Sequence, residues 1–129
     1  MKILLDTQCW LWLQTSPERI SDRVRERLAD QEHAIFLSAA SAWEIAIKYA
    51  LGKLPLPRPP AQYVPSRMQR SGTESLHVSH EHALRVAGLP PHHRDPFDRV
   101  LVAQAQLEGM WLLTADPQLA AYDVKLLRA

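Results

Sequence analysis

Four acidic residues stand where a sequence could bring carboxylates into one site. Asp6 and Asp116 each follow a short apolar run, as a residue at the carboxyl end of a buried strand would. Glu44 and Asp98 lie in stretches with helical spacing. Because ligands of open α/β sheets bind at the carboxyl ends of strands, two strand ends and two helix faces could direct all four acids into one pocket.

A cluster of this kind would need positive charge. Two carboxylates about 5 Å apart repel each other by roughly 3 kcal/mol at an effective dielectric near 20, so a cation or shared protons must offset the charge. Hard oxygen ligands with open coordination positions favour Mg²⁺ or Mn²⁺. Such ions activate water and stabilise charge on a phosphodiester. The sequence spacing alone does not show that the four acids meet in the folded protein.

Each acid also has an ordinary structural explanation. Asp6 could be a turn residue that begins the next helix, and Asp116 could cap the helix that follows it. Asp98 could be a first-turn acid favoured by the helix dipole. However, the residues three, four and seven positions later are apolar, so Asp98 begins the side of the helix that faces the core, and this favours a functional role. Glu44 and Lys48 are spaced i, i+4 and could form a surface pair.

Strands and helices are predicted to alternate along the chain. Short apolar runs predict strands at 3–5, 34–37, 74–78, 111–114 and 124–127. Helical patterns are found at 9–13, 20–30, 38–51, 62–70, 79–87, 96–108 and 117–121. Pro65 should confine its helix mostly to the residues after it, and Asp95 should cap the helix that Pro96 opens. The alternation favours a three-layer α/β domain with a mostly parallel sheet.

The composition limits the class of protein. With 129 residues, 47% apolar and 22% charged, the chain should form one globular domain over 1–129 rather than a disordered chain. Fifteen Lys plus Arg against fourteen Asp plus Glu argue against a strongly basic nucleic-acid module, so any such contact needs a local patch. The single Cys9 and the lack of a long apolar run predict a cytoplasmic protein without disulfides or a membrane span.

Two further groups of residues invite a functional interpretation that we do not favour. His80, Glu81 and His82 do not form a zinc-protease helix, because that motif needs His at position 84, which is Leu; we expect an exposed first helical turn. The tryptophans could stack on bases, but all of them lie in apolar runs, so we expect them in the core. They are Trp10, Trp12, Trp43 and Trp111.

The four acids lie in four short stretches of the sequence. They are LLDT at 4–7, SAASAWEIAIK at 38–48, HRDPFDR at 93–99 and LTAD at 113–116. In this order, they resemble the PIN-domain ribonucleases, and within that family the VapC-type toxins of bacterial toxin–antitoxin pairs. The resemblance implies a PIN-like α/β/α fold and a Mg²⁺- or Mn²⁺-dependent endoribonuclease, the toxin of a type II pair, that hydrolyses RNA phosphodiester bonds with metal-activated water.

The resemblance also implies roles for individual residues. Asp6 and Asp98 would be the principal metal ligands, Asp116 would complete the acidic site, and Glu44 would hold metal-bound water or a second ion. Thr7 and Thr114 would supply hydroxyl groups next to these carboxylates. Partners implied by the resemblance are a second copy in a homodimer and a cognate antitoxin that blocks the acidic groove.

Positive side chains near the acids could contact RNA phosphate. Arg94 lies in the loop before the Asp98 helix, and Lys48 and Arg99 lie beside the other acids, although a solvated position explains each of them equally well. Asp95 belongs to a matching stretch, but we favour its role as a helix cap.

Two alternative functions are open at this stage. A phosphatase that forms an aspartyl-phosphate needs a second acid two positions after Asp6, where this chain has Gln8. A non-catalytic PIN-fold binding module would be favoured by the loss of an acid, but all four acids are present.

Overall fold

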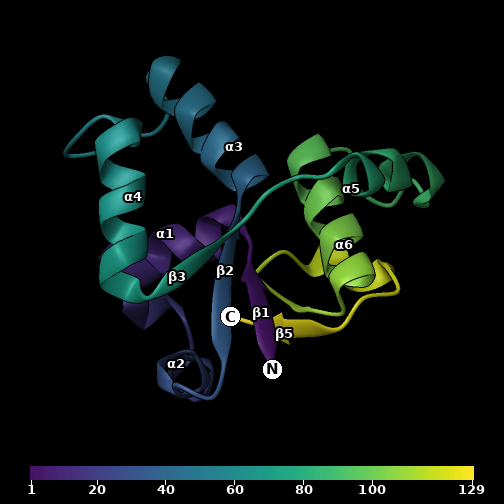
Figure 1. Cartoon of the computed structure of the whole chain (residues 1–129), viewed down its shortest axis with the longest axis horizontal. Helices are drawn as coiled ribbons and strands as arrows, with labels where there is room; N and C mark the ends of the chain where they lie inside the picture. Colours follow the sequence, from purple (N-terminus) through teal and green to yellow (C-terminus); the bar gives the residue numbers. More distant parts are fainter.

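A parallel sheet of five strands forms the centre of the computed structural model, which describes residues 1–129 (Figure 1). The strands are β1 (Lys2–Leu5), β2 (Ala34–Ser38), β3 (Thr73–Leu76), β4 (Trp111–Thr114) and β5 (Leu126–Arg128). Their order in the sheet is β3-β2-β1-β4-β5, and every neighbouring pair is parallel. The chain therefore builds outward from β1 in both directions, and the order reverses between β1 and β4. Open α/β sheets bind ligands at such a reversal.

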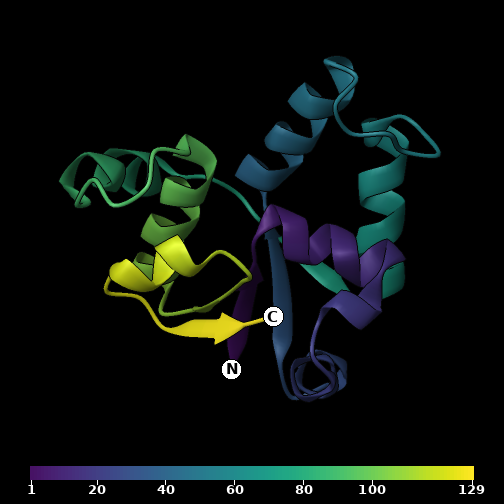
Figure 2. The same ribbon diagram turned by 180° about the vertical axis from the view of Figure 1, so that it is seen from behind.

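Helices connect the strands and cover both faces of the sheet (Figures 1 and 2). They are α1 (Thr7–Thr15), α2 (Asp22–Ala29), α3 (Ala39–Ala50), α4 (Pro60–Ser71), α5 (His80–Arg85) and α6 (Pro96–Glu108). Short 3-10 turns occupy Pro17–Arg19, Val86–Gly88 and Pro117–Ala121. None of the helices combines the length and the apolar character that a membrane span requires.

The core is divided into two apolar clusters by the sheet. Ile3 and Leu5 on β1 pack into one cluster with Trp10 of α1 and with side chains of α2, α3 and α4. Leu4, between them in the sequence, belongs to the opposite cluster with Leu101 of α6. This alternation follows from the two-residue period of a strand. The predicted three-layer α/β/α arrangement is confirmed.

Helix α4 begins earlier than predicted. It starts at Pro60, where a helix needs no N–H donor, and it runs through Pro65. The prediction that Pro65 would confine the helix to later residues is wrong. Proline at this position removes one backbone hydrogen bond, and the burial of Tyr63 and Val64 against the core offsets that loss. The helix ends at Gly72, whose φ of 65° suits a residue without a Cβ.

Two expectations about burial are also wrong. His82 is only 5% exposed, because α5 packs on α6 and the ring contacts the backbone N–H of Ser79 and the carboxylate of Glu108. Trp43 is 64% exposed, because the buried face of α3 is formed by other residues, including Glu44 and Ile45. Of the remaining tryptophans, Trp10 is fully buried, and Trp12 and Trp111 are partly buried.

Candidate active site

The carboxyl ends of β1 and β4 open into a polar pocket of about 310 Å³. All four acids singled out in the sequence line this pocket, together with a fifth acid, two neutral polar residues, one alanine and one lysine. The lining residues are Asp6, Thr7, Gln8, Glu44, Lys48, Asp95, Asp98, Ala115 and Asp116. The pocket, which we call the acidic pocket, lies at the reversal of strand order.

Asp6 is a buried residue that lines the acidic pocket and also caps α1. Its Oδ1 accepts a hydrogen bond from the Cys9 backbone N–H at 2.7 Å, and its Oδ2 accepts one from the Thr114 hydroxyl at 2.6 Å. Burial raises the pKa of Asp6, and these hydrogen bonds only partly oppose the effect. The capping role and the position in the pocket are therefore compatible.

Asp116 combines the same two roles at the end of β4. Its Oδ1 accepts a hydrogen bond from the Gln118 backbone N–H at 2.9 Å, and its Oδ2 lies 2.8 Å from His93 Nε2. Burial alone would raise the pKa of Asp116, but the hydrogen bonds from Gln118 and His93 hold it below the usual value. Thr114 also accepts the Asp116 backbone N–H through its hydroxyl, so one side chain links both strand-end acids.

Asp98 is the least satisfied of the acids. It lies in the first turn of α6, which Asp95 caps by accepting the Phe97 backbone N–H at 2.9 Å, as predicted. The only polar partner of Asp98 is His93 Nε2, at 3.4 Å. Burial raises the pKa of Asp98 to about 7, with further contributions from the negative charges of Asp95 and Asp6. This carboxylate would gain most from a nearby cation.

Glu44 reaches the acidic pocket from α3. Its Oε1 accepts a hydrogen bond from the Thr7 hydroxyl at 2.7 Å, and its Oε2 lies 2.6 Å from Lys48 Nζ. The hydrogen bond to Glu44 raises the pKa of Lys48. The pair is not an ordinary surface pair, because the side chain of Glu44 is 6% exposed and that of Lys48 is 50% exposed.

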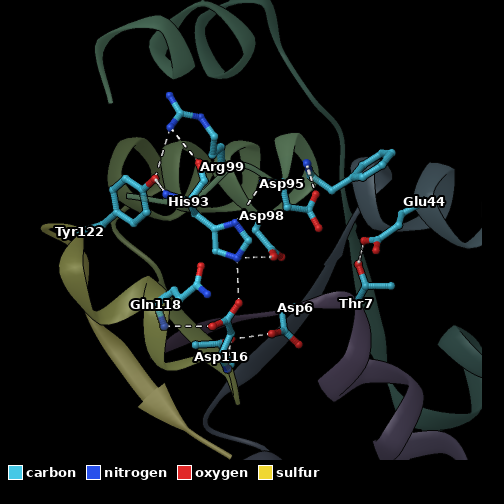
Figure 3. A network of polar contacts seen from close by, with 12 residues as sticks. Asp6, Thr7, Glu44, His93, Asp95, Asp98, Arg99, Asp116, Gln118 and Tyr122 are labelled. Atoms are coloured by element: carbon cyan, nitrogen blue, oxygen red, sulfur yellow. Dashed lines mark hydrogen bonds and ion pairs between the residues drawn. The ribbon is translucent and has the colours of Figure 1, made fainter. Parts of the chain in front are cut away.

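His93 joins the acids, although the sequence did not single it out as part of their cluster. The close-up in Figure 3 shows its ring between Asp98 and Asp116. One candidate ligand atom from each of these three residues lies within 4.8 Å of the other two. The residue is part of the HRDPFDR stretch, but only the fold of the loop before α6 brings its ring to the carboxylates.

The guanidinium of Arg99, a candidate for contact with RNA phosphate, makes its hydrogen bonds within the protein. It donates hydrogen bonds to the Tyr122 hydroxyl and to four backbone carbonyl oxygens of the segment before α6. The carbonyls belong to Val86, Leu89, Pro90 and His93. This arrangement gives Arg99 the role of holding that segment. Arg94 is exposed, and Lys48 lines the acidic pocket.

The donor set of the acidic pocket suits a hard divalent cation. Carboxylate oxygens dominate the lining, and Lys48 is the only lysine or arginine among the lining residues. The ligand atoms of Asp98 and Asp116 lie within reach of one ion, and burial together with the neighbouring negative charges raises the pKa of Asp98, which a bound cation would oppose. Mg²⁺ and Mn²⁺ prefer such oxygen ligands.

Comparison with known proteins gives one family match and one similar curated protein. Residues 3–125 match the family described as PIN domain. Ribonuclease VapC16 of Mycobacterium tuberculosis (strain ATCC 25618 / H37Rv) is 53% identical over 79 residues, which cover 57% of this chain and 56% of that protein. The chain thus matches just over half the length of this relative.

Solved structures with the same fold include three complexes. VapBC2 from Rickettsia felis, bound to a DNA fragment from its promoter, aligns with a TM-score of 0.75 at 16% identity over 99% of this chain and 98% of the other. DNA-bound VapBC from Salmonella typhimurium gives 0.73 at 16% identity, with coverage of 99% and 98%. A toxin–antitoxin complex from Klebsiella pneumoniae gives 0.56 at 19% identity, with coverage of 92% and 90%. At these identities, the similarity establishes the fold alone.

Proposed function

Because the chain belongs to the PIN domain family, we propose that it is an endoribonuclease that hydrolyses RNA phosphodiester bonds with the help of Mg²⁺ or Mn²⁺. The observation that carries this proposal is the convergence of Asp6, Glu44, Asp98 and Asp116 on one pocket where the strand order reverses. The 53% identical relative is named a ribonuclease, which supports the same activity.

The acids divide into those that would hold the cation and those that shape its surroundings. Asp98 and Asp116 offer ligand atoms within 4.8 Å of each other, and Asp6 and Glu44 line the same pocket. When bound, the ion would supply positive charge that lowers the pKa of water and offsets charge on the phosphate. Thr114 fixes the Asp6 carboxylate, and Thr7 fixes that of Glu44.

Positive side chains outside the acid cluster would bind the RNA backbone. Lys48 lies on the wall of the acidic pocket and is half exposed, so its ammonium group can approach a phosphate while it remains paired with Glu44. Arg94 is exposed in the loop before α6. Arg99 would contribute indirectly, by holding that loop through its hydrogen bonds to the backbone.

A reaction without a side-chain nucleophile agrees with the geometry. Cys9 is fully buried, and its pKa is raised by burial, so it is not available as a thiolate. Both oxygens of Asp6 accept hydrogen bonds from the protein, and Gln8 stands where an aspartyl-phosphate phosphatase needs its second acid. Direct attack by water is therefore favoured over the phosphatase alternative.

We further propose that the protein is the toxin of a type II toxin–antitoxin pair and forms a homodimer. The name VapC16 of the relative and the toxin–antitoxin complex among the structures of the same fold support the antitoxin partner. The exposed Trp43 on α3 provides apolar surface for contact with a second copy. Sedimentation equilibrium of the purified chain tests the dimer: a monomer mass at micromolar concentration would contradict it.

The experiment that tests the activity is cleavage of mixed cellular RNA by purified protein with Mg²⁺, with Mn²⁺ and with EDTA. Asp98→Asn should be inactive, and Asp123→Asn, which changes an exposed carboxylate outside the acidic pocket, should cut as the unmodified protein does. Cutting that continues in EDTA or in Asp98→Asn would contradict the proposed site. Folded protein that binds Mg²⁺ in calorimetry but cuts none of these RNAs would favour a narrower RNA target. Folded protein that neither cuts nor binds the ion would favour the non-catalytic binding module.

A further inference from the structure

The ring of His93 lies between two acids that come from different elements. Its Nε2 is 2.8 Å from Asp116 Oδ2, at the end of β4, and 3.4 Å from Asp98 Oδ2, on α6 (Figure 3). We propose that His93 is a positioning residue of this site, which donates a hydrogen bond from Nε2 to the Asp116 carboxylate beside Asp98 and does not itself ligate the metal. The inference rests on the proposed function, because it takes the two carboxylates as metal ligands.

The other ring nitrogen identifies Nε2 as the donor. His93 Nδ1 lies 3.0 Å from the backbone N–H of Asp95, and a backbone N–H can only donate a hydrogen bond. Nδ1 must therefore accept this bond through its lone pair and carries no proton. The proton of the imidazole is then on Nε2, which faces the carboxylates. A protonated ring nitrogen has no lone pair for a cation, so Nε2 cannot be a metal ligand in this arrangement.

The backbone of His93 is held from the side opposite to the acids. Its N–H donates to the Tyr122 hydroxyl at 3.0 Å, and its carbonyl oxygen accepts a hydrogen bond from Arg99 at 3.3 Å. Arg99 also contacts the Tyr122 hydroxyl and so closes the network. With the ring fixed through Nδ1 and the backbone fixed by these two residues, the Nε2–H direction is set before any cation arrives.

A fixed donor at this point holds the Asp116 carboxylate in place beside that of Asp98. Asp98 has no other polar partner, and the second oxygen of Asp116 is already fixed by the Gln118 N–H. The Nε2–H therefore orients the Asp116 oxygen that would bind the ion, next to the Asp98 carboxylate, and it brings no positive charge that would compete with the ion. Groups that orient metal ligands in this way typically account for about 10–100-fold in metal affinity.

Nitrogen NMR of the full chain with ¹⁵N-labelled histidine tests the donor assignment directly. At pH 8, the His93 ring should show a protonated Nε2 and an unprotonated Nδ1, both in EDTA and in saturating Mg²⁺. A spectrum in which Mg²⁺ leaves Nε2 without a proton would make His93 a ligand and overturn the proposal. A proton on Nδ1 in either state would overturn it as well.

Matched variants separate positioning from a merely structural role. By calorimetry, His93→Leu should bind Mn²⁺ roughly 10–100-fold more weakly than the unmodified protein. His93→Gln should recover most of that affinity, because the glutamine amide carries an N–H donor at a similar reach. His80→Leu makes the same change on the exposed surface of α5 and should bind Mn²⁺ normally.

The outcomes also distinguish this inference from the proposed function. Unmodified protein that binds neither Mn²⁺ nor Mg²⁺ would contradict the proposed function, and with it the metal-related part of the inference. Unmodified protein that binds Mn²⁺, with equal affinity in His93→Leu, would overturn the role of His93 alone. Equal loss of affinity in the Leu and Gln variants would also overturn it. If His93→Leu does not fold, the NMR result on the unmodified chain decides the question.

Discussion

Helices α3 and α6 present opposite chemistry on two neighbouring surfaces. Glu44 and Asp98 enter the acidic pocket, whereas Trp43 and Phe97, one residue earlier on each helix, line an apolar groove of about 440 Å³. The two rings meet edge to face with their centroids 5.4 Å apart. The groove is completed by small and apolar residues, namely Ala39, Ala40, Val78, Ala83, Pro96 and Val100.

The two surfaces differ in how far the chain itself supplies partners for their side chains. In the acidic pocket, hydrogen bonds or an ion pair hold Asp6, Glu44 and Asp116, and the unfavourable charge is concentrated on Asp98. In the apolar groove, no other part of the chain covers Trp43, which is 64% exposed. Local capping can therefore satisfy carboxylates within one chain, whereas an apolar surface requires a covering element.

Removing one carboxylate from the acidic pocket should affect RNA cleavage more than any other change considered. Asp98→Asn keeps the size of the side chain but removes the charge that most needs a cation, so RNA cleavage should fall by about 10³-fold or more, or about 4 kcal/mol in activation free energy. Initial rates on one cleaved RNA, with saturating Mn²⁺, measure the effect. A variant on the groove side, Phe97→Leu, should retain most of the activity. Equal losses in the two variants would mean that the two surfaces are not separable.

The next effect is the dependence of stability on pH without metal. The pKa of Asp98 is about 7 in the folded protein, against 3.8 for an ordinary aspartate in the unfolded chain, so between these values the folded state holds a proton that the unfolded state has lost. The free energy of unfolding should therefore fall by a few kcal/mol as pH rises from about 4 to about 7. The shift of Asp6 acts in the same direction, whereas the lowered pKa of Asp116 acts in the opposite direction and mainly below the ordinary value of 3.8, outside this window. Urea unfolding in EDTA at several pH values measures the slope.

Asp98→Asn provides the control for the pH effect. It should flatten the slope and make the metal-free protein more stable than the unmodified protein at pH 8. Mg²⁺ should stabilise the unmodified protein at that pH by mass action, and it should stabilise the variant much less. If the substitution leaves the slope unchanged, the pH dependence of the free energy of unfolding does not come from Asp98.

The acidic pocket and the apolar groove also differ in how far the sequence predicts them. Asp6 and Asp116 were identifiable because a strand end is a local signal, and parallel strands bring such ends to one edge. His93 was not identifiable as their partner, since its position depends on a loop held by Arg99 and Tyr122. Trp43 was misplaced because an apolar residue on an apolar helix gives the same pattern in a core and on an exposed surface.

A smaller effect is expected from the hydrogen bond that holds Glu44. Thr7→Val keeps the shape of the side chain but leaves Glu44 Oε1 without the hydroxyl, which lies at 2.7 Å and is buried. Hydrogen bonds to charged groups contribute about 1.5–3 kcal/mol, and Lys48 still pairs with the other oxygen, so we expect a loss near the lower end, about 1.5 kcal/mol. Urea unfolding at pH 7 measures it. Thr15→Val, on the exposed end of the same helix, should cost less.

The smallest effect is expected at Trp43, and its size bears directly on the comparison of the two surfaces. Trp43→Ala removes an edge-to-face contact with Phe97 and little buried area, so it should lower the free energy of unfolding by about 1 kcal/mol or less. Trp10→Ala, the same change at a fully buried position, should cost about 3–5 kcal/mol. The measurement is urea unfolding at a concentration where the chain is monomeric. A loss at Trp43 as large as that at Trp10 would mean that the ring is covered within one chain, and that the apolar groove is as well satisfied as the core. A small loss in the monomer, with a larger one at concentrations where copies associate, would assign the energetic value of the ring to contact with the second copy.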